Sequence, residues 1–328
     1  MTLDVLQPER TALLVVDMQN AFCHREGTLA ISGVDVAPAQ AVIDPIRRLV
    51  ERCDEVGIPV VWTQQEHFAV DHSRARKRLP SHTAKRARVS ALSGSADMQL
   101  VDELAPLAND PSLVIRKHRF GCFYETRLEL VLRMLGIQAL LVVGVTANAC
   151  VETTLREAYL RDYDVVAITD CIAAVRPEWE PTAHQVWGQY LGVLATSADV
   201  HAWLDRAVEP RALELGHLLL QTNDLVRAED FYLRLLGFTV RKREAFRDGR
   251  ELIVTDQGLA LTDGRPSGAS PVEHLAFRAR GVRALAERAR GAGVDVLRGP
   301  EPSAYGVSVY LADPDGNQLE LYGDEDRA

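Results

Sequence analysis

Residues 139–170 read ALLVVGVTANACVETTLREAYLRDYDVVAITD, and this stretch contains the pattern that decides the fold. Residues 139–146 and 164–170 are short apolar runs rich in β-branched side chains, as expected for buried strands. The residues between them, from about Asn148 to Tyr163, have the pattern of a helix. A strand, a helix and a second apolar strand in succession predict a βαβ unit with parallel strands.

The same alternation extends outward from this stretch over the first two-thirds of the chain. Near-continuous apolar strands separated by helices are typical of a parallel sheet that is covered on both faces. We therefore predict an α/β domain with three layers. Ligands of such sheets bind at the carboxyl ends of the strands, where Asp17, Lys117 and Thr146 are expected. The remaining strands are expected at 11–19, 58–64 and 113–119, and further helices at 37–56 and 126–135.

An internal repeat follows a short polar stretch at 205–212. Both copies have the expected order β-α-β-β-β, the first beginning at LGHLLLQ (215–221) and the second at EHLAFRA (273–279). His217 and His274 fall at the same place in their copies, and aligning GLAL with QLEL puts Ala260 opposite Glu320. We predict two domains, residues 1–208 and 213–328, of which the second is an α+β domain of two βαβββ repeats.

The composition excludes several classes of function. The 328 residues have a net charge of −9, whereas nucleic-acid binding requires a positive surface. No apolar run reaches the roughly 20 residues needed to cross a membrane. The N-terminal residues, MTLDVLQPERTALLVV, do not resemble a signal peptide. We expect a cytoplasmic protein that acts on a small molecule, without nucleic-acid or membrane partners.

Cysteine usage agrees with a reducing compartment. The number of cysteines is odd and no pair has the spacing of metal ligands, so reduced thiols are expected instead of disulfides. Most of them should be small buried residues. The five are Cys23, Cys53, Cys122, Cys150 and Cys171.

Cys150 is the candidate nucleophile among them. It lies near the start of a predicted helix, directly after a strand, and the positive end of a helix lowers the pKa of a thiol. Backbone N–H groups at the same point can bind the oxyanion of a tetrahedral intermediate. A nucleophilic cysteine also needs a base. Asp17 can serve as that base if Lys117 maintains its charge and orientation.

Three segments carry a family resemblance: LLVVDMQNAF, VIRKHRFGCFYET and VVGVTANACVETTLREAY. They resemble the signature segments of the isochorismatase-like cysteine hydrolases, over about residues 8–206. The resemblance implies that Asp17 is the base, Lys117 the lysine and Cys150 the nucleophile, and that a cis peptide bond precedes Thr146. Family members that cleave a vinyl ether do not need the thiol, so Cys150 implies cleavage of an amide, ureide or carbamoyl C–N bond. The stretch ETTLREAYLRDYDVV looks most similar to the ureidoacrylate amidohydrolase branch.

Two departures from the family pattern concern the pocket. Gln65 stands where nicotinamidases have a metal-binding Asp, and only His67 of that metal site is retained, so we expect no cofactor in the first domain and doubt nicotinamide as the substrate. The sequence GCF at 121–123 replaces a serine-containing turn. Several side chains are expected either to line the pocket or to belong to the core. They are Gln19, Phe22, Phe120, Tyr124, Thr146 and Asn148.

The second domain carries a candidate metal site at His217, His274 and Glu320. Two imidazoles and one carboxylate suit Fe, Mn or Zn as divalent ions and leave coordination positions open for a substrate. The repeat places Ala260 where a fourth ligand would lie. DFYLRLLGF and YLADPDGNQLELY resemble signatures of the vicinal oxygen chelate superfamily, which includes glyoxalase I, extradiol dioxygenases, fosfomycin-modifying transferases and metal-free bleomycin-binding proteins. The three-residue ligand set resembles the dioxygenase and fosfomycin-resistance types.

A basic stretch from Asp71 to Ser90 interrupts the alternation of strands and helices. One interpretation is a solvated surface excursion. The other is a basic flap that attracts an anionic substrate or contacts a neighbouring subunit. Its cations are Arg74, Arg76, Lys77, Arg78, Lys85, Arg86 and Arg88.

Together these features predict a bifunctional enzyme, expected to form a homo-oligomer (a dimer or tetramer). The first domain would hydrolyse a C–N bond through a cysteine thioester, and the second would perform a metal-dependent step on the same or a related metabolite. Two alternatives remain. The second domain could be a non-catalytic module that binds a small molecule or antibiotic, or it could be the main activity, as a metal-dependent dioxygenase, transferase or lyase.

Overall fold

The computed structural model describes residues 3–70, 86–245, 249–264, 272–312 and 318–323. The chain divides into two compact units, residues 1–207 and 208–327. Within the described residues, no helix has both the length and the apolar composition that crossing a membrane requires.

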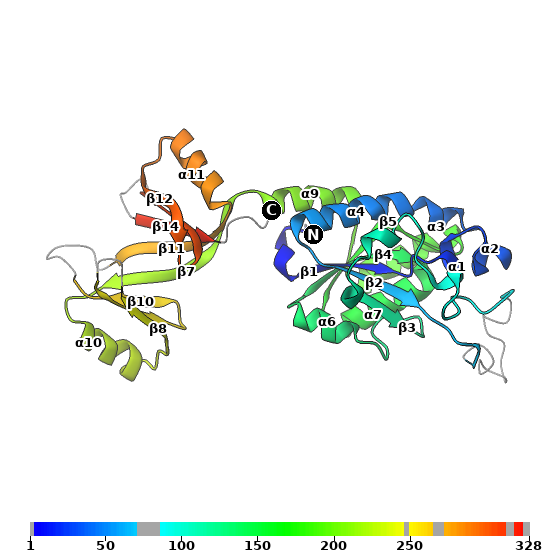
Figure 1. The fold of residues 1–328 in the computed structure, drawn as a ribbon, viewed down its shortest axis with the longest axis horizontal. Coiled ribbons are helices and arrows are strands. Elements are labelled where there is room, and N and C mark those ends of the chain that lie inside the picture. The colour runs from blue at the N-terminus through cyan, green and yellow to red at the C-terminus, as the bar shows by residue number, and fades with distance from the viewer. Residues whose placement is uncertain (1–2, 71–85, 246–248, 265–271, 313–317, 324–328) are drawn as a thin grey trace. The chain divides into compact units, whose positions relative to one another are not determined.

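The first unit is built on a sheet of six parallel strands (Figure 1). Their order is β3-β2-β1-β4-β5-β6, so β1 lies at the centre and the strand order reverses beside it. Ligand sites of open parallel sheets form at such a reversal, outside the carboxyl ends of the strands. The strands are β1 Thr11–Val16, β2 Val60–Gln65, β3 Val114–Lys117, β4 Ala139–Val145, β5 Asp164–Ala173 and β6 Val193–Ala195.

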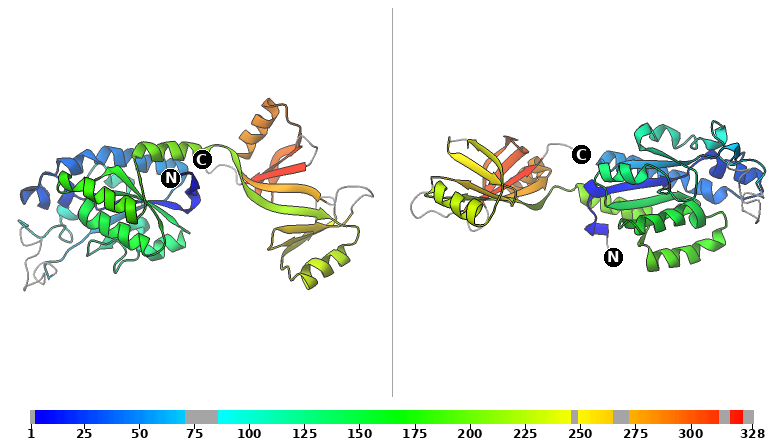
Figure 2. Two further views of the ribbon diagram at one scale, coloured as in Figure 1. Left: turned by 180° about the vertical axis from the view of Figure 1, so that it is seen from behind. Right: turned by 90° about the horizontal axis from the view of Figure 1, so that it is seen from below.

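Both faces of this sheet are buried, because alternate residues of each strand point to opposite sides. Leu13 and Val15 of β1 belong to one core, and Leu14 and Val16 belong to the other. Helix α4 (Ile43–Val56) covers the first face together with α9 (Ser197–Val208), and the opposite face carries three helices. Figures 1 and 2 show the resulting layers, with helices above and below the sheet. The predicted three-layer α/β architecture is confirmed. The helices of the opposite face are α6 Leu128–Met134, α7 Glu152–Tyr159 and α8 Glu180–Tyr190.

The helix expected over 37–56 is divided into α3 (Ala37–Ala41) and α4. Pro45 lies in the first turn of α4 and has no N–H with which to bond the carbonyl four residues earlier. The chain therefore turns at Val42 before the longer helix begins. Two short helices precede this region, α1 Asn20–Cys23 and α2 Thr28–Ile31.

The second unit contains the two predicted βαβββ repeats, joined edge to edge in one sheet of eight strands. The strand order is β12-β13-β14-β11-β7-β10-β9-β8, so the first strands of the two repeats, β7 and β11, pair in the middle as antiparallel neighbours. The first repeat is β7 Arg211–Gln221, α10 Leu225–Glu229, β8 Val240–Ala245, β9 Glu251–Thr255 and β10 Leu259–Thr262. The second repeat is β11 Val272–Arg280, α11 Val282–Gly291, β12 Val296–Ser303, β13 Gly306–Ala312 and β14 Gln318–Gly323.

The strand registers relate Ala260 to Glu320. In the first repeat, Ala260 on β10 pairs with Leu219, two residues after His217. In the second repeat, Glu320 on β14 pairs with Ala276, two residues after His274. The two positions are therefore equivalent in the repeats, as the alignment of GLAL with QLEL predicts.

Candidate active site and metal centre

Asp17 follows β1 directly, at the carboxyl end of the first unit's sheet. Its backbone lies in the left-handed region (φ 51°), which is uncommon for a residue other than glycine and is found preferentially at functional sites. Gly144 on β4 permits the close approach of the two strands, since a Cβ there would lie 2.1 Å from the carbonyl oxygen of Val16. Thr63 Oγ1 donates to Asp17 Oδ1 at 2.7 Å and accepts from the Asp17 N–H at 3.1 Å. Thr63 therefore fixes the orientation of the carboxylate.

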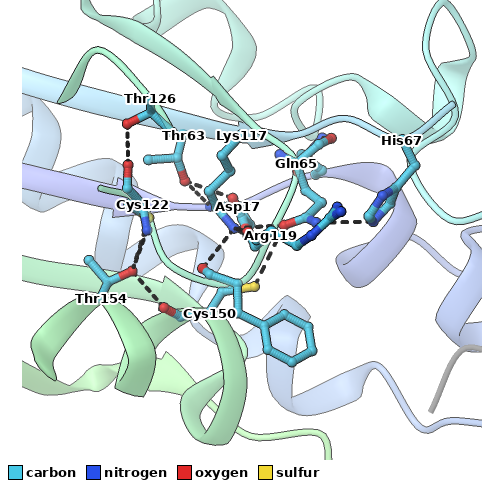
Figure 3. Close-up of polar contacts among 12 residues, drawn as sticks. Asp17, Thr63, Gln65, His67, Lys117, Arg119, Cys122, Thr126, Cys150 and Thr154 are labelled. Atoms are coloured by element: carbon cyan, nitrogen blue, oxygen red, sulfur yellow. Dashed lines mark hydrogen bonds and ion pairs between the residues drawn. The ribbon is translucent and has the colours of Figure 1, made fainter. Parts of the chain in front are cut away.

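Lys117, the last residue of β3, is the partner of Asp17. Its Nζ lies 2.7 Å from Asp17 Oδ2, and both side chains are 0% exposed. Nζ also donates to the backbone carbonyl oxygens of Arg119 and Phe120, each at 3.0 Å. Burial by itself lowers the pKa of Lys117, but the adjacent Asp17 carboxylate raises it above the ordinary value. Lys117 consequently stays protonated and offsets the buried charge of Asp17 (Figure 3).

Gln65, the last residue of β2, joins the lysine to the thiol. Its Oε1 accepts from Lys117 Nζ at 2.7 Å and lies 3.9 Å from Cys150 Sγ (Figure 3). This assignment leaves Nε2 as a donor, so His67 Nε2, 3.0 Å away, is the acceptor. The sequence singled out Gln65 only as a departure from a metal-binding pattern. Its contacts to Lys117 and Cys150 became visible only in the structure.

Cys150 lies on a π-helical turn, Ala147–Val151, between β4 and α7. The peptide bond between Val145 and Thr146 is cis, as the family resemblance implies. Burial raises the pKa of the thiol well above its ordinary value, the positive charge of Lys117 opposes this, and Asp17 raises the pKa further through its charge and a hydrogen bond. The expectation of a lowered pKa at a helix start is therefore wrong, because burial is the largest contribution and raises the pKa. The raised pKa favours the neutral thiol at rest, and Sγ lies 3.9 Å from its hydrogen-bond acceptor, Gln65 Oε1.

Cys122 is the other thiol of this network, and Thr154 connects the two. Thr154 Oγ1 contacts Cys122 Sγ at 3.0 Å and donates to the backbone oxygen of Cys150 at 2.6 Å. Cys122 is 0% exposed, whereas Cys150 is 7% exposed and lines a cavity. Burial raises the pKa of Cys122 to about 11. All five cysteines are free, and of this pair Cys150 is the thiol that a ligand can reach.

The cavity at Cys150 has a volume of about 380 Å³. Four of the expected pocket residues line it: Phe22, Phe120, Thr146 and Asn148. The lining residues that sequence reasoning missed are Leu29, Ser90, Val145, Ala149, Val175 and Trp179. Gln65 and His67, noted earlier only for the metal-binding pattern, also line the cavity, as does Arg86 of the basic stretch.

The other two expected pocket residues lie elsewhere. Gln19 Nε2 donates to the backbone oxygens of Gln65 and Met98, and its Oε1 accepts from the Gln65 N–H, so Gln19 joins the end of β2 to the short helical turn that ends at Met98. Tyr124 is half exposed and is not among the lining residues.

The basic stretch is described only from Arg86 onward, and Arg74, Arg76, Lys77, Arg78 and Lys85 lie outside the described residues. Arg88 donates to Asp97 Oδ1 at 2.8 Å and to the Glu26 carbonyl oxygen at 2.9 Å. Arg86 lines the cavity. Nothing in the sequence distinguished Arg86 from its basic neighbours.

In the second unit, His217 and His274 on the paired strands β7 and β11 converge with Glu320 on β14. The His274 Nε2 lies 3.3 Å from His217 Nε2 and 3.1 Å from Glu320 Oε2, and the His217 Nε2 lies 3.9 Å from the same oxygen. One donor atom from each side chain lies within 4.8 Å of the others, as in a metal-binding group. Because Gly216 has no side chain, the Tyr322 hydroxyl can lie against its backbone beside the site; a Cβ at Gly216 would lie 2.0 Å from that hydroxyl.

The surroundings of His217 and Glu320 favour the protonation states in which these two side chains bind metal ions. Burial lowers the pKa of His217 and so favours the neutral imidazole. Burial by itself raises the pKa of Glu320, but hydrogen bonds with His274 and Tyr310 bring it below the ordinary value. Tyr310 Oη donates to Glu320 Oε1 at 2.8 Å and leaves Oε2 facing the imidazoles. A cavity of about 180 Å³ opens here, with Ala260 and Tyr305 in its wall.

Comparison with known proteins assigns families to both parts of the chain. Residues 11–199 match the model of the isochorismatase domain, and residues 214–321 match that of the glyoxalase/bleomycin resistance protein/dioxygenase superfamily. The ureidoacrylate amidohydrolase RutB of Acinetobacter baylyi is 35% identical over 184 residues, which cover 52% of this chain and 74% of that protein.

Two solved structures that resemble this chain each cover about three-fifths of it. A cysteine hydrolase from Pseudomonas syringae pv. phaseolicola has a TM-score of 0.53 at 26% identity, covering 62% of this chain and 95% of its own. An isochorismatase family protein from Desulfovibrio vulgaris subsp. vulgaris has a TM-score of 0.52 at 26% identity, covering 60% of this chain and 99% of its own.

Proposed function

We propose that the first domain cleaves the C–N bond of a small amide, ureide or carbamoyl compound through a thioester on Cys150. The chain belongs to the isochorismatase family, as an isochorismatase-like amidohydrolase fused to a glyoxalase-like domain. The observation that carries this proposal is the buried Asp17–Lys117 ion pair beside a thiol that faces a cavity. The likeness to a ureidoacrylate amidohydrolase supports a ureide as the first compound class to test.

The first half of the reaction forms the thioester. Because the raised pKa of Cys150 favours a neutral thiol at rest, the thiol proton passes to Asp17 as Sγ attacks the carbonyl carbon. The tetrahedral intermediate then collapses, the C–N bond breaks, and Asp17 returns the proton to the departing nitrogen. Ammonia or an amine leaves, and the acyl or carbamoyl group remains on Cys150.

The second half hydrolyses the thioester. Asp17 takes a proton from a water molecule, which attacks the thioester carbon, and the C–S bond breaks. The thiol regains a proton, and an acid or carbamate is released. Between the proton transfers, Lys117 offsets the buried charge of Asp17 and holds its carboxylate in place through their ion pair. Gln65 holds the ammonium group of the lysine next to the sulfur.

The second domain is proposed to bind a divalent metal ion through His217, His274 and Glu320. The convergence of two imidazole nitrogens and one carboxylate oxygen supports this assignment. A bound Fe, Mn or Zn ion would act as a Lewis acid toward a substrate with two adjacent oxygens. Tyr310 would orient the carboxylate through its hydrogen bond.

An ammonia-release screen over amides, ureides and carbamoyl compounds tests the hydrolase. We expect Cys150→Ser to abolish turnover and Cys122→Ser to retain it, since only Cys150 lines the cavity. Equal activity of wild-type protein and Cys150→Ser would overturn the mechanism.

Metal analysis tests the second domain. Wild-type protein is expected to bind about one equivalent of Fe, Mn or Zn, and His217→Ala is expected to lose it. If neither protein binds any of these metals, the second domain is a metal-free binding module.

A further inference from the structure

The segment that follows Lys117 supplies two of its hydrogen-bond acceptors. The backbone oxygens of Arg119 and Phe120 each lie 3.0 Å from Lys117 Nζ. Residues 119–123, called the lysine loop below, include the sequence GCF (121–123) that departs from the family pattern. The position of the ammonium group therefore depends on where this loop is held.

Thr154 of α7 joins the lysine loop to the turn that bears the nucleophile. Its Oγ1 accepts from the Cys122 N–H at 3.2 Å and donates to the backbone oxygen of Cys150 at 2.6 Å (Figure 3). The side chain of Thr154 is fully buried, so water does not compete for these two bonds. One hydroxyl thus fixes the distance between the loop and the nucleophile's backbone.

Glu157, three residues further along α7, holds the next part of the loop. Its Oε2 accepts from the Phe123 N–H at 2.9 Å. Gly121 permits this approach, because a Cβ on Gly121 would overlap the Glu157 carboxylate. Arg161, just beyond α7, places its guanidinium over the Phe123 ring at 4.9 Å. Residues three apart on a helix lie on one face, so Thr154 and Glu157 form a single row of attachments to the loop.

These attachments act at a distance from any ligand. Among the described residues, Thr154 and Glu157 do not line the cavity at Cys150. Lys117 is the group through which they can affect the chemistry, because its positive charge lowers the pKa of the Cys150 thiol and opposes the effect of burial. A displaced ammonium group would leave the thiolate less stable and its attack slower.

We propose that Thr154 and Glu157 are positioning residues of the hydrolase. By fastening the lysine loop to α7, they keep the Lys117 ammonium group at a fixed place relative to the Cys150 thiol. The consequence for turnover rests on the proposed function. The consequence for the thiol does not, because the reactivity of Cys150 can be measured without a substrate.

Alkylation of the free protein by iodoacetamide at pH 8, with the modified cysteine identified by mass spectrometry, is the first readout. Thr154→Val removes the hydroxyl at nearly constant volume and should slow alkylation of Cys150 about three- to tenfold. Loosening of the fold alone would have the opposite sign, since it exposes the buried thiol and speeds alkylation. Thr154→Ser keeps the hydroxyl and should react within about twofold of the wild-type rate. Thr153→Val, the same substitution at the neighbouring, partly exposed position of α7, is the matched control and should also stay within about twofold.

The second attachment is tested from both of its sides. Glu157→Ala removes the carboxylate, and Gly121→Ala displaces it, so each should slow alkylation of Cys150 at least about threefold. Glu157→Gln retains an oxygen that can accept from the Phe123 N–H and should stay within about twofold of wild type. If Thr154→Val does not fold, these three variants decide the proposal.

Ammonia release is the second readout, with the compound that the wild-type protein hydrolyses fastest. For Thr154→Val we expect kcat to fall about 10- to 100-fold and KM to stay within about threefold. The reason is that a misplaced catalytic group slows the chemical step, whereas the cavity wall is unchanged. Thr154→Ser should recover most of kcat.

Unchanged or faster alkylation of Cys150 in Thr154→Val would overturn the proposal, and so would a failure of Thr154→Ser to restore the rate. Wild-type kcat in Thr154→Val would overturn it as well. If the alkylation results hold but no compound releases ammonia, the positioning role stands and the proposed hydrolysis is rejected. Tryptophan fluorescence checks that each variant is folded.

Discussion

Replacement of Lys117 by Met should both destabilise the first unit and abolish hydrolysis. Lys117 Nζ and Asp17 Oδ2 are 2.7 Å apart with no exposed surface. Two unit charges at that distance attract by about 6 kcal/mol at an effective dielectric constant of about 20. Removal of one partner leaves the other buried and unpaired, which typically costs about 3–5 kcal/mol. We expect a loss of about 4 kcal/mol in the free energy of unfolding.

A double-mutant cycle separates the ion pair from the loss of packing. Asp17→Asn combined with Lys117→Met leaves two neutral side chains of similar size. The double variant should therefore be more stable than the sum of the single losses predicts, by at least about 2 kcal/mol. It should remain inactive, because the base is absent.

The four tryptophans make this measurement specific. Trp62, Trp179, Trp187 and Trp203 all lie in the first unit, so urea unfolding followed by tryptophan fluorescence reports on that unit alone. Arg133→Met, which removes an exposed cation, should change the stability by less than about 0.5 kcal/mol. The reasoning is refuted if the coupling is below about 0.5 kcal/mol, or if Lys117→Met hydrolyses substrate at the wild-type rate.

Three further predictions concern pH, metal binding and the loop beside the cavity. Burial raises the pKa of Cys150 well above its ordinary value. The rate of alkylation of the free protein by iodoacetamide should therefore rise about tenfold per pH unit from 7 to 9. A rate that reaches a plateau below pH 8 would contradict this. Ala260→Glu adds a carboxylate at the position equivalent to Glu320. The variant should strengthen Zn binding at least tenfold. Its second unit should be less stable than wild type without metal and regain stability when Zn is added, as thermal denaturation can measure. Burial raises the pKa of Asp97, but hydrogen bonds from Thr28, Ala91 and Arg88 bring it below the ordinary value, so its contribution to stability is present above about pH 4 and is lost as the pH falls. Asp97→Asn should lower the free energy of unfolding by about 2 kcal/mol at pH 7 and make that free energy less dependent on pH between 5 and 3. An unchanged midpoint of urea unfolding at pH 7 would show that the carboxylate is dispensable.

The sequence by itself determined the architecture and the positions of the principal chemical groups. Apolar strands alternating with helices require a parallel sheet, and the carboxyl ends of parallel strands meet at one edge. That geometry brings Asp17 and Lys117 together although they are 100 residues apart in the printed sequence. The repeat likewise relates Ala260 to Glu320, because both copies follow the same strand order and the pairing register is set by the pleat.

Only the tertiary structure decided how these groups are charged and what they contact. The raised pKa of Cys150 and the bond between Gln65 and Lys117 depend on burial and on side chains from distant segments. The same holds for Arg86 Nη1, which has no hydrogen-bond partner among the described residues. Periodicity reports which face of an element is apolar, and it carries no information about which polar atom meets which. Arg86 and Arg88 are both cations of the same basic stretch, but Asp97 bonds to one and leaves the other in the cavity wall. The fold therefore follows from local patterns, whereas the chemistry of the site follows from contacts that form when the chain is folded.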